Sequence, residues 1–283
     1  MSVMEYLNIE GTKIPLVGLG CFALHGRALT ESLAIALEEG YELFDTAFKY
    51  DNEKEMGKYF TSNNIYRENI IIQTKVCARQ LLGSKILWGV DKRSISSAYE
   101  YSCRLLGRSY IDVYLVHSPF VKVANYYREL VKLKDDGKIG IIGVCNFTRE
   151  QLQAIKLATG IYPMLNQIEV HPYHNSKELV AFCKDNGIIV EARSPFAHGD
   201  ALHDWLTNKV LQKIAKEYNK SVPQIILRWI TQQNIIALPR SKTFQHIKDN
   251  INIFDFDLTS TQVSVLDRLN RNQSYGFIST INS

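Results

Sequence analysis

The chain has 283 residues, of which 46% are hydrophobic and 22% are charged, as is ordinary for a soluble globular protein. Its 33 basic and 29 acidic residues are interspersed without a run of five or six like charges, which argues against a nucleic-acid tract or a membrane-surface patch. No apolar run reaches the roughly 18 residues of a membrane span. We therefore expect no nucleic acid and no membrane among the partners.

The five cysteines are odd in number, widely spaced and without a CxxC motif. That pattern indicates reduced thiols, with neither a disulfide framework nor a zinc site. The first residues lack the basic stretch and apolar stretch of a signal peptide. We expect a cytoplasmic protein, and the absence of a Pro/Gly/Ser-rich linker predicts one domain over residues 1–283.

The chain opens with short β-type runs on either side of Glu10-Gly11, which predict a small hairpin over 6–15. Short, mostly apolar runs then recur along the sequence, as expected for strands that are buried on both faces. The predicted strands are 16–20, 43–45, 70–75, 111–117, 139–144, 164–169, 188–193 and 235–239.

Segments with helical spacing lie between these runs. The first follows Thr30, an expected N-cap, and ends before Gly40, an expected C-cap. One helix is expected to begin at Ser221, because Pro223 falls near its first helical position. The other predicted helices are 94–106, 127–136, 148–157, 177–186, 206–218 and 259–269.

Eight strands that alternate with helices predict a parallel sheet. The fold class is therefore α/β, and we expect a (β/α)8 TIM barrel with an N-terminal hairpin and a C-terminal extension. An open doubly wound sheet is the alternative. Against it, the first strand and turn around Gly18 and Gly20 lack the third glycine of GxGxxG, and no acidic residue follows at the usual distance.

Polar side chains stand at the carboxyl ends of successive predicted strands. Asp45 ends the second strand, Lys75 the third and His117 the fourth, while Tyr50 lies in the loop after Asp45. Because strand ends of a barrel share the face where active sites are built, these four residues should meet in one pocket.

This combination suits general acid catalysis. A free tyrosine has a pKa near 10, and a nearby ammonium is expected to lower it. We therefore expect Lys75 to lower the pKa of Tyr50, Asp45 to hold Lys75, and His117 to orient a carbonyl oxygen or relay a proton.

The ordered motifs of the whole chain resemble those of the aldo-keto reductases. The segment from Asp45 to Glu53 (DTAFKYDNE) resembles the family's signature around its catalytic Asp and Tyr. Thr74-Lys75 and the segment LVHSP, which contains His117, match the Lys and His segments. Further matches are the segments GVCNF, NQIEVHP and LPRS. The resemblance implies a catalytic tetrad of Asp45, Tyr50, Lys75 and His117.

The same resemblance implies a nicotinamide cofactor bound without a Rossmann fold or a metal. Asn146 and Gln167 would hydrogen-bond the nicotinamide carboxamide, beside Cys145 where the family has serine. Arg193 would stand where the family stacks an aromatic ring, and a planar guanidinium can also stack. The remaining implied cofactor contacts are Ser194, Phe196, Asp200, Arg240, Ser241, His246 and Asn250, with Asp200 pairing with Arg240. NADPH is favoured, with NADH as the alternative.

The expected substrate is a small-molecule carbonyl compound. Its pocket is predicted from the loops after the strands and includes Phe22, Trp88, Ser118 and Phe120. A cofactor-binding regulatory protein with the same fold and little turnover is the alternative, since Cys145, Arg193 and Ser118 depart from the family pattern. We expect a monomer or weak dimer and no metal, because the HPYH segment from His171 lacks a further ligand at suitable spacing.

Overall fold

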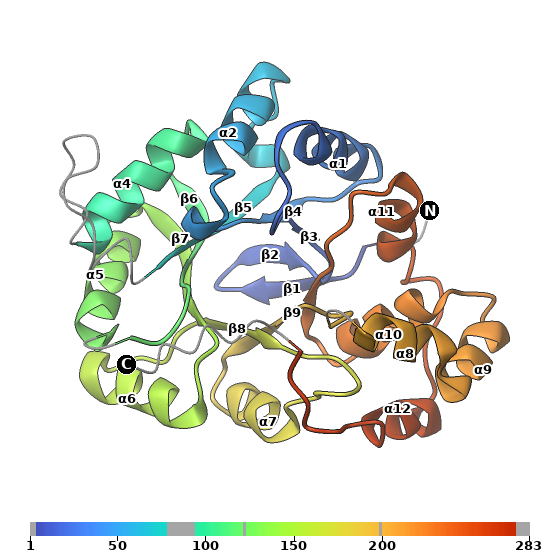
Figure 1. Ribbon diagram of the computed structural model, residues 1–283. Helices are drawn as coiled ribbons and strands as arrows, with labels where there is room; N and C mark the ends of the chain where they lie inside the picture. Colours follow the sequence, from blue (N-terminus) through green and yellow to red (C-terminus); the bar gives the residue numbers. More distant parts are fainter. Residues whose placement is uncertain (1–3, 78–93, 121–122, 198–199, 276–283) are drawn as a thin grey trace.

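Eight parallel strands form a barrel with helices around it (Figure 1). The computed structural model describes residues 4–77, 94–120, 123–197 and 200–275. Strand neighbours follow chain order from β3 to β10. The bounds are β3 (Leu19–Gly20), β4 (Leu43–Asp45), β5 (Ile71–Val76), β6 (Ile111–Val116), β7 (Ile139–Cys145), β8 (Leu165–Glu169), β9 (Ile189–Arg193) and β10 (Ile236–Leu238).

Backbone hydrogen bonds between the first and last strands close the barrel. The residues before β3 pair with β10, because Val17 forms a parallel bridge with Ala237. Gly18 N donates to Ala237 O at 3.0 Å, and Ala237 N donates to Leu16 O at 2.8 Å. The predicted (β/α)8 architecture is therefore confirmed, and the open-sheet alternative is wrong.

The helices cover the outside of the barrel (Figure 1). Several begin at a capping box, in which the N-cap hydroxyl and the glutamine three residues later satisfy each other's backbone amides, as at Thr148, Ser221 and Thr259. None of the helices in the described part of the chain is long and apolar enough to cross a membrane. The bounds are α1 (Gly26–Glu38), α2 (Glu53–Ser62), α4 (Ile95–Leu106), α5 (Val123–Asp135), α6 (Arg149–Thr159), α7 (Lys177–Asp185), α8 (Asp200–Thr207), α9 (Lys209–Glu217), α10 (Val222–Thr231), α11 (Phe244–Ile251) and α12 (Ser260–Asp267).

Several helices differ from the sequence prediction. The helix α1 begins at Gly26, so Thr30 lies inside it and donates its hydroxyl to Gly26 O instead of capping. The predicted helix 206–218 is interrupted, because Asn208 caps a new helix by accepting from Val210 N and Leu211 N. The helices α2 and α11 were not predicted at all.

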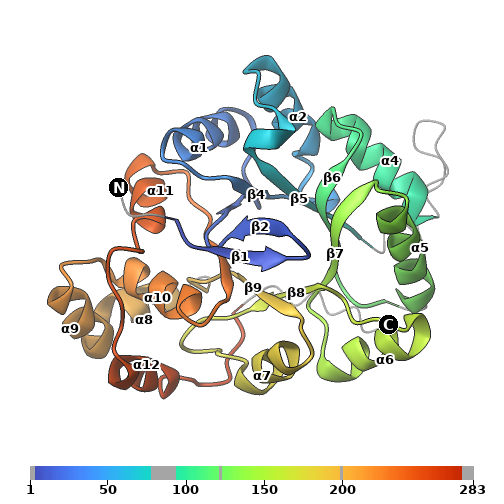
Figure 2. The same ribbon diagram turned by 180° about the vertical axis from the view of Figure 1, so that it is seen from behind.

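The predicted N-terminal hairpin closes one end of the barrel (Figure 2). It consists of β1 (Tyr6–Ile9) and β2 (Thr12–Pro15), joined at Glu10 and Gly11, which both have positive φ. Ile9 and Ile14 are buried in one cluster with side chains that point into the barrel, including Leu43, Val113 and Ile141. Apolar contacts therefore seal this end of the barrel, and the site lies towards the carboxyl ends of the strands.

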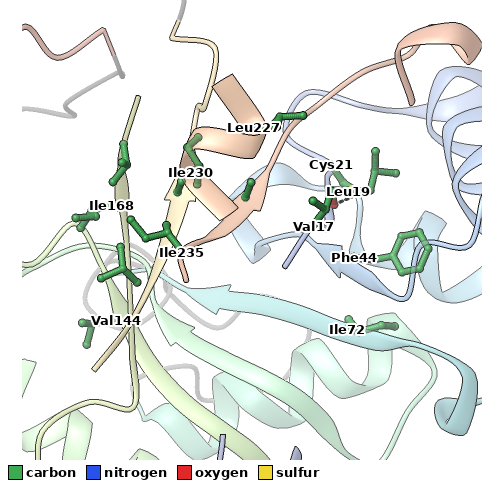
Figure 3. Packing of buried hydrophobic residues seen from close by; sticks show 14 of the residues in the cluster. Val17, Leu19, Cys21, Phe44, Ile72, Val144, Ile168, Leu227, Ile230 and Ile235 are labelled. Carbon is green, nitrogen blue, oxygen red and sulfur yellow. Dashed lines mark hydrogen bonds between the residues drawn. The ribbon is translucent and has the colours of Figure 1, made fainter. Parts of the chain in front are cut away.

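Alternation along the strands separates two sets of side chains. Val17, Leu19, Phe44 and Ile72 belong to the larger buried cluster between strands and helices, and Figure 3 shows them with Leu227 and Ile230 of α10. The intervening residues point into the barrel. Those near the hairpin are apolar, whereas those near the carboxyl ends of β4, β5, β8 and β9 are polar and buried.

The close approach of α2 and α4 requires Gly57. A Cβ at this position would lie 2.5 Å from Leu105 O and from Leu106 C, which are both backbone atoms. We predict that Gly57→Ala lowers the free energy of unfolding by about 1–3 kcal/mol, because overpacking against backbone outweighs alanine's higher helix propensity. Urea denaturation tests this, with the exposed neighbour in Lys58→Ala as a control expected to stay within about 0.5 kcal/mol of wild type. A Gly57→Ala protein as stable as wild type would contradict the proposed packing.

Candidate functional site

A layer of buried polar side chains fills the carboxyl end of the barrel. The strand register brings its members together, since Asp45 pairs in register with Gln73 and Gln167 with Glu191. Lys75 lies two residues beyond Gln73 on β5, so both point inward. Each of these five residues is at most 5% exposed.

Lys75 is a fully buried ammonium whose charge is compensated on two sides. Its Nζ lies 2.5 Å from Asp45 Oδ1 and donates to Thr46 O at 2.8 Å. Burial alone would lower the pKa of Lys75, but the charges of Asp45 and Tyr50 raise it above its ordinary value. Lys75 is therefore a permanent cation inside the barrel at physiological pH.

Tyr50 and His117 complete the predicted group of four. Lys75 Nζ lies 3.4 Å from Tyr50 Oη, and the rings of Tyr50 and His117 meet edge to face with centroids 5.6 Å apart. Tyr50 ends a short 3-10 helix, Phe48–Tyr50, which turns its side chain back towards the strand ends. The structure therefore brings the four residues together, as the strand-end argument predicted.

The ionisation of Tyr50 and His117 follows from their burial. Burial raises the pKa of Tyr50 to about 12, and the opposing effect of Lys75 is smaller. Lys75 acts in the expected direction, but burial outweighs it and the net shift of this pKa is upward. Burial and the charges of Lys75, Lys49 and Arg193 lower the pKa of His117 to about 3. At neutral pH Tyr50 carries its proton and His117 is a neutral imidazole.

Two glutamine side chains connect the ion pair to a second carboxyl group. Gln73 Nε2 donates to Asp45 Oδ1 and to Glu191 Oε2, at 2.7 Å each. Gln167 Nε2 donates to Glu191 Oε2 at 2.9 Å and to Asp45 Oδ1 at 3.3 Å. Burial, and then the charge of Asp45, raise the pKa of Glu191 to about 7. Gln167 thus belongs to the same hydrogen-bonded network as Lys75.

The residues predicted around a nicotinamide ring form a chain of contacts next to this network. Cys145 Sγ lies 3.5 Å from Gln167 Oε1, and Asn146 Nδ2 lies 3.0 Å from Cys145 Sγ. Arg193 Nε donates to Asn146 Oδ1 at 2.7 Å. Asn146 has a φ of 65°, a left-handed conformation that asparagine adopts more readily than most residues.

Glu169 holds Arg193 and the chain that follows α12. Arg193 Nη2 lies 3.5 Å from Glu169 Oε2, while His171 Nε2, Ser274 Oγ and Tyr275 N contact the same carboxylate within 2.9 Å. Burial would raise the pKa of Glu169, but these hydrogen bonds and Arg193 lower it to about 2. His171 therefore has a partner in the protein, and the described residues contain no group of three or more metal-binding side chains.

A separate pocket of about 410 Å³ lies between the first strand–helix loop and the segment after β10. Arg240, Ser241 and Lys242 line it opposite Leu24 and His25. Arg240 Nη1 also lies 3.5 Å from Phe22 O. The pocket therefore combines two cations, Arg240 and Lys242, with a hydroxyl, which suits a phosphate group.

Other predicted cofactor residues occupy varied settings. Ser194 has a positive φ of 50°, and its carbonyl accepts from Ala197 N at 2.8 Å, so the chain turns sharply after β9. Phe196 is half-buried against the core. On α11, His246 is exposed and Asn250 is buried. The side chain of Asp200 lies outside the described part of the structure, so its pairing with Arg240 stays a prediction.

The predicted substrate residues divide into two groups. Phe22 is 44% exposed and meets Tyr50 edge to face, with ring centroids 5.1 Å apart. Ser118 follows His117 directly and is half-buried. Phe120 instead packs against Tyr126, at 5.3 Å between centroids. Trp88 lies outside the described residues.

Sequence reasoning did not find Gln73, Glu191, His25 or Lys242. Gln73 and Glu191 interrupt otherwise apolar strands, and a polar residue in a strand buried on both faces is a detectable signal. Lys242 follows the predicted pair Arg240 and Ser241 directly and adds a second cation to their pocket. His25 carries no comparable signal in the sequence.

Comparison with known proteins agrees with this geometry. The model of the Aldo/keto reductase family matches residues 18–271. A glyoxal reductase of Bacillus subtilis is 37% identical over 271 residues, covering 94% of this chain and 93% of the relative. A methylglyoxal reductase of Yersinia pestis is 34% identical over 270 residues, with 94% and 93% covered. The crystal structure of a Bombyx mori aldo-keto reductase in complex with NADP superposes with a TM-score of 0.85 at 28% identity, covering 98% of this chain and 96% of that one.

The fold is a closed barrel, and a lysine–aspartate pair, a tyrosine and a histidine meet at its carboxyl end. This combination is the one expected of an oxidoreductase built on a (β/α)8 barrel. The family model covers most of the chain, and the Bacillus subtilis relative is 37% identical over 94% of it, so these matches identify the family. The chain belongs to the aldo/keto reductase family, and it is an NAD(P)H-dependent carbonyl reductase.

Ionisation of Glu191 gives a stability prediction. Folding raises the pKa of Glu191 from 4.5 to about 7. The folding stability that this shift contributes is therefore fully present below pH 4.5 and is lost as the pH rises through 7. We predict that the free energy of unfolding of Glu191→Gln, relative to wild type, increases by about 3 kcal/mol between pH 4.5 and pH 8. Urea denaturation without cofactor measures this difference.

Glu169→Gln provides the matched comparison with the opposite sign. Folding lowers the pKa of Glu169 to about 2, so its contribution is present at pH 7 and is lost only in acid. This variant should be less stable than wild type at pH 7. Stability curves of wild type and Glu191→Gln that run parallel from pH 4.5 to pH 8 would contradict the raised pKa.

Proposed function

We propose that the protein reduces a small aldehyde or ketone to the alcohol with NADPH, and that Tyr50 donates the proton. The observation that supports this most directly is the position of Tyr50 Oη, 3.4 Å from the buried Lys75 Nζ and beside the ring of His117. A phenol, an ammonium and an imidazole thus converge at one point, which is where we propose that the carbonyl oxygen binds.

The side chains present suit a nicotinamide dinucleotide. Polar atoms for a ring carboxamide are offered by Asn146, Cys145 and Gln167. Asn146 Nδ2 lies 3.0 Å from Cys145 Sγ, which in turn lies 3.5 Å from Gln167 Oε1. The cationic pocket at Arg240 and Lys242 suits a phosphate at the other end of such a molecule. When bound, the reduced cofactor supplies a hydride to the carbonyl carbon.

Proton transfer is the contribution of the protein. With a pKa of about 12, Tyr50 holds its proton at neutral pH and can deliver it to the carbonyl oxygen. The charge of Lys75 stabilises the phenolate that remains, and Asp45 keeps Lys75 charged and in place. His117 is neutral, so its ring can donate a hydrogen bond that orients the same oxygen.

Two observations favour NADPH over NADH. Arg240 and Lys242 line one pocket, and an arginine fork matches a phosphate group in geometry as well as in charge. The Bombyx mori relative was crystallised with NADP. We therefore assign this pocket to the adenosine 2′-phosphate.

The names of the relatives suggest where to look for the substrate. Two of them are a glyoxal reductase and a methylglyoxal reductase, so small dicarbonyl compounds are the first candidates. Beside the proposed proton donor, the exposed ring of Phe22 lies against Tyr50, and Ser118, which carries a hydroxyl, directly follows His117. That combination suits a short carbonyl compound with a second oxygen.

Tyr50→Phe tests the proposal. Removal of one hydroxyl should lower kcat for reduction of methylglyoxal or glyoxal by about 10²–10⁴-fold, the usual contribution of general acid catalysis. The dissociation constant for NADPH should stay within about twofold of wild type. Oxidation of NADPH followed at 340 nm, with NADH compared in parallel, measures turnover. Undiminished turnover in Tyr50→Phe would show that another group donates the proton.

A further inference from the structure

The strand β9 carries two charged side chains of opposite sign on its inward face. Glu191 and Arg193 are two residues apart and therefore point to the same side. Each one contacts a side-chain amide: Glu191 contacts Gln167 on the neighbouring strand β8, and Arg193 contacts Asn146, which directly follows β7. These are the two amides that we assign to the cofactor carboxamide.

Glu191 and Asp45 together determine how the Gln167 amide is oriented, and Glu191 makes the shorter contact. Above its pKa of about 7, Glu191 is a carboxylate, which only accepts hydrogen bonds and therefore selects the NH₂ group of Gln167. Gln167 Nε2 donates to Glu191 Oε2 at 2.9 Å and to Asp45 Oδ1 at 3.3 Å, and both of its protons are then used. The remaining polar atom, Oε1, is an acceptor and faces Cys145 Sγ at 3.5 Å.

Arg193 imposes the opposite orientation on Asn146. A guanidinium only donates, so it selects the oxygen of the Asn146 amide. Arg193 Nε donates to Asn146 Oδ1 at 2.7 Å, and the ion pair with Glu169 at 3.5 Å holds the guanidinium in place. Asn146 therefore directs its donor, Nδ2, towards Cys145 Sγ at 3.0 Å and His117 O at 3.3 Å.

We propose that Glu191 and Arg193 are positioning residues, which orient Gln167 as an acceptor and Asn146 as a donor so that the pair recognises a carboxamide. A carboxamide has one acceptor, its oxygen, and donors on its nitrogen, which matches this arrangement. The inference rests on the proposed binding of the cofactor at these two amides. It adds the residues that give the site its preference for an amide over a ketone at that position of the ring.

The burial of Glu191 supports a role beyond packing. It is 0% exposed, and its Oε1 has no hydrogen-bond partner among the described residues. A carboxyl group in that setting is costly, and an apolar side chain of similar volume is often neutral or stabilising in its place. Its two donors are Gln73 and Gln167, and only Gln167 reaches the cofactor residues.

Cofactor analogues test the inference without relying on turnover. The 3-acetylpyridine analogue of NADP⁺ keeps the carbonyl oxygen but replaces the NH₂ group by methyl, so it cannot donate to Gln167 Oε1. Calorimetric titration of the wild type should show NADP⁺ binding about five- to tenfold more tightly than the analogue, as expected for one hydrogen bond. In Glu191→Gln, whose side chain can also donate, only Asp45 still selects the NH₂ group of Gln167, and the preference should fall below that of the wild type.

Three further variants separate positioning from a structural effect. Glu191→Asp keeps a carboxylate and should retain part of the preference. Arg193→Met should weaken both ligands by a similar factor, because both keep the oxygen that Asn146 binds. Glu53→Gln changes another buried carboxyl, on α2, whose pKa is likewise about 7 and which accepts from Thr74 at 2.6 Å. The preference of the Glu53→Gln protein for NADP⁺ over the analogue should equal that of wild type.

The outcomes are distinct. A wild-type preference that Glu191→Gln retains, or a loss of affinity for both ligands by the same factor in that variant, overturns the role of Glu191. If Arg193→Met loses affinity for NADP⁺ but not for the analogue, the role assigned to Arg193 is overturned. If the wild type binds neither ligand, the proposed function itself is wrong at this site. If it binds both equally, the function stands and the inference fails.

Discussion

The buried ion pair between Lys75 and Asp45 is the interaction on which the rest of the site depends. Lys75 is 0% exposed, and an ammonium in that position requires compensation by a nearby anion and by hydrogen bonds. Asp45 Oδ1 and Thr46 O provide both. Separating the two residues would leave each with an unpaired buried charge. The pair therefore holds β4 and β5 together next to Tyr50. The proposed proton donor is thus built around a charge fixed by the fold.

Polar contacts spread from this pair to the side chains assigned to the cofactor. Gln73 and Gln167 both donate to Asp45 and both donate to Glu191, so one network joins the ammonium to the predicted carboxamide contacts. The two halves of the reaction, proton delivery and hydride delivery, are therefore supported by neighbouring members of one layer. Below that layer the interior is apolar and is closed by the hairpin, which keeps water away from the charges.

Much of this arrangement was predictable from the sequence, because short apolar runs locate the strands and a barrel brings strand ends together. That argument placed Asp45, Lys75 and His117 correctly. It did not find α2, whose central Gly57 weakens the local helical signal and is required by the contact with α4. Nor did it find Glu191, since the role of a polar residue within a strand depends on which strands are neighbours. The ionisation of Tyr50 also depended on burial, which the sequence alone does not determine.

A double-mutant cycle on the ion pair tests the central claim most directly. The variants are Asp45→Asn, Lys75→Met and the combination, and the measured quantity is kcat/KM for carbonyl reduction. If Asp45 acts through Lys75, each single change lowers kcat/KM strongly and the double variant is no slower than the slower single variant. Losses that multiply in the double variant would show that the two residues act independently, and the account of a single charge-fixed proton donor would be contradicted.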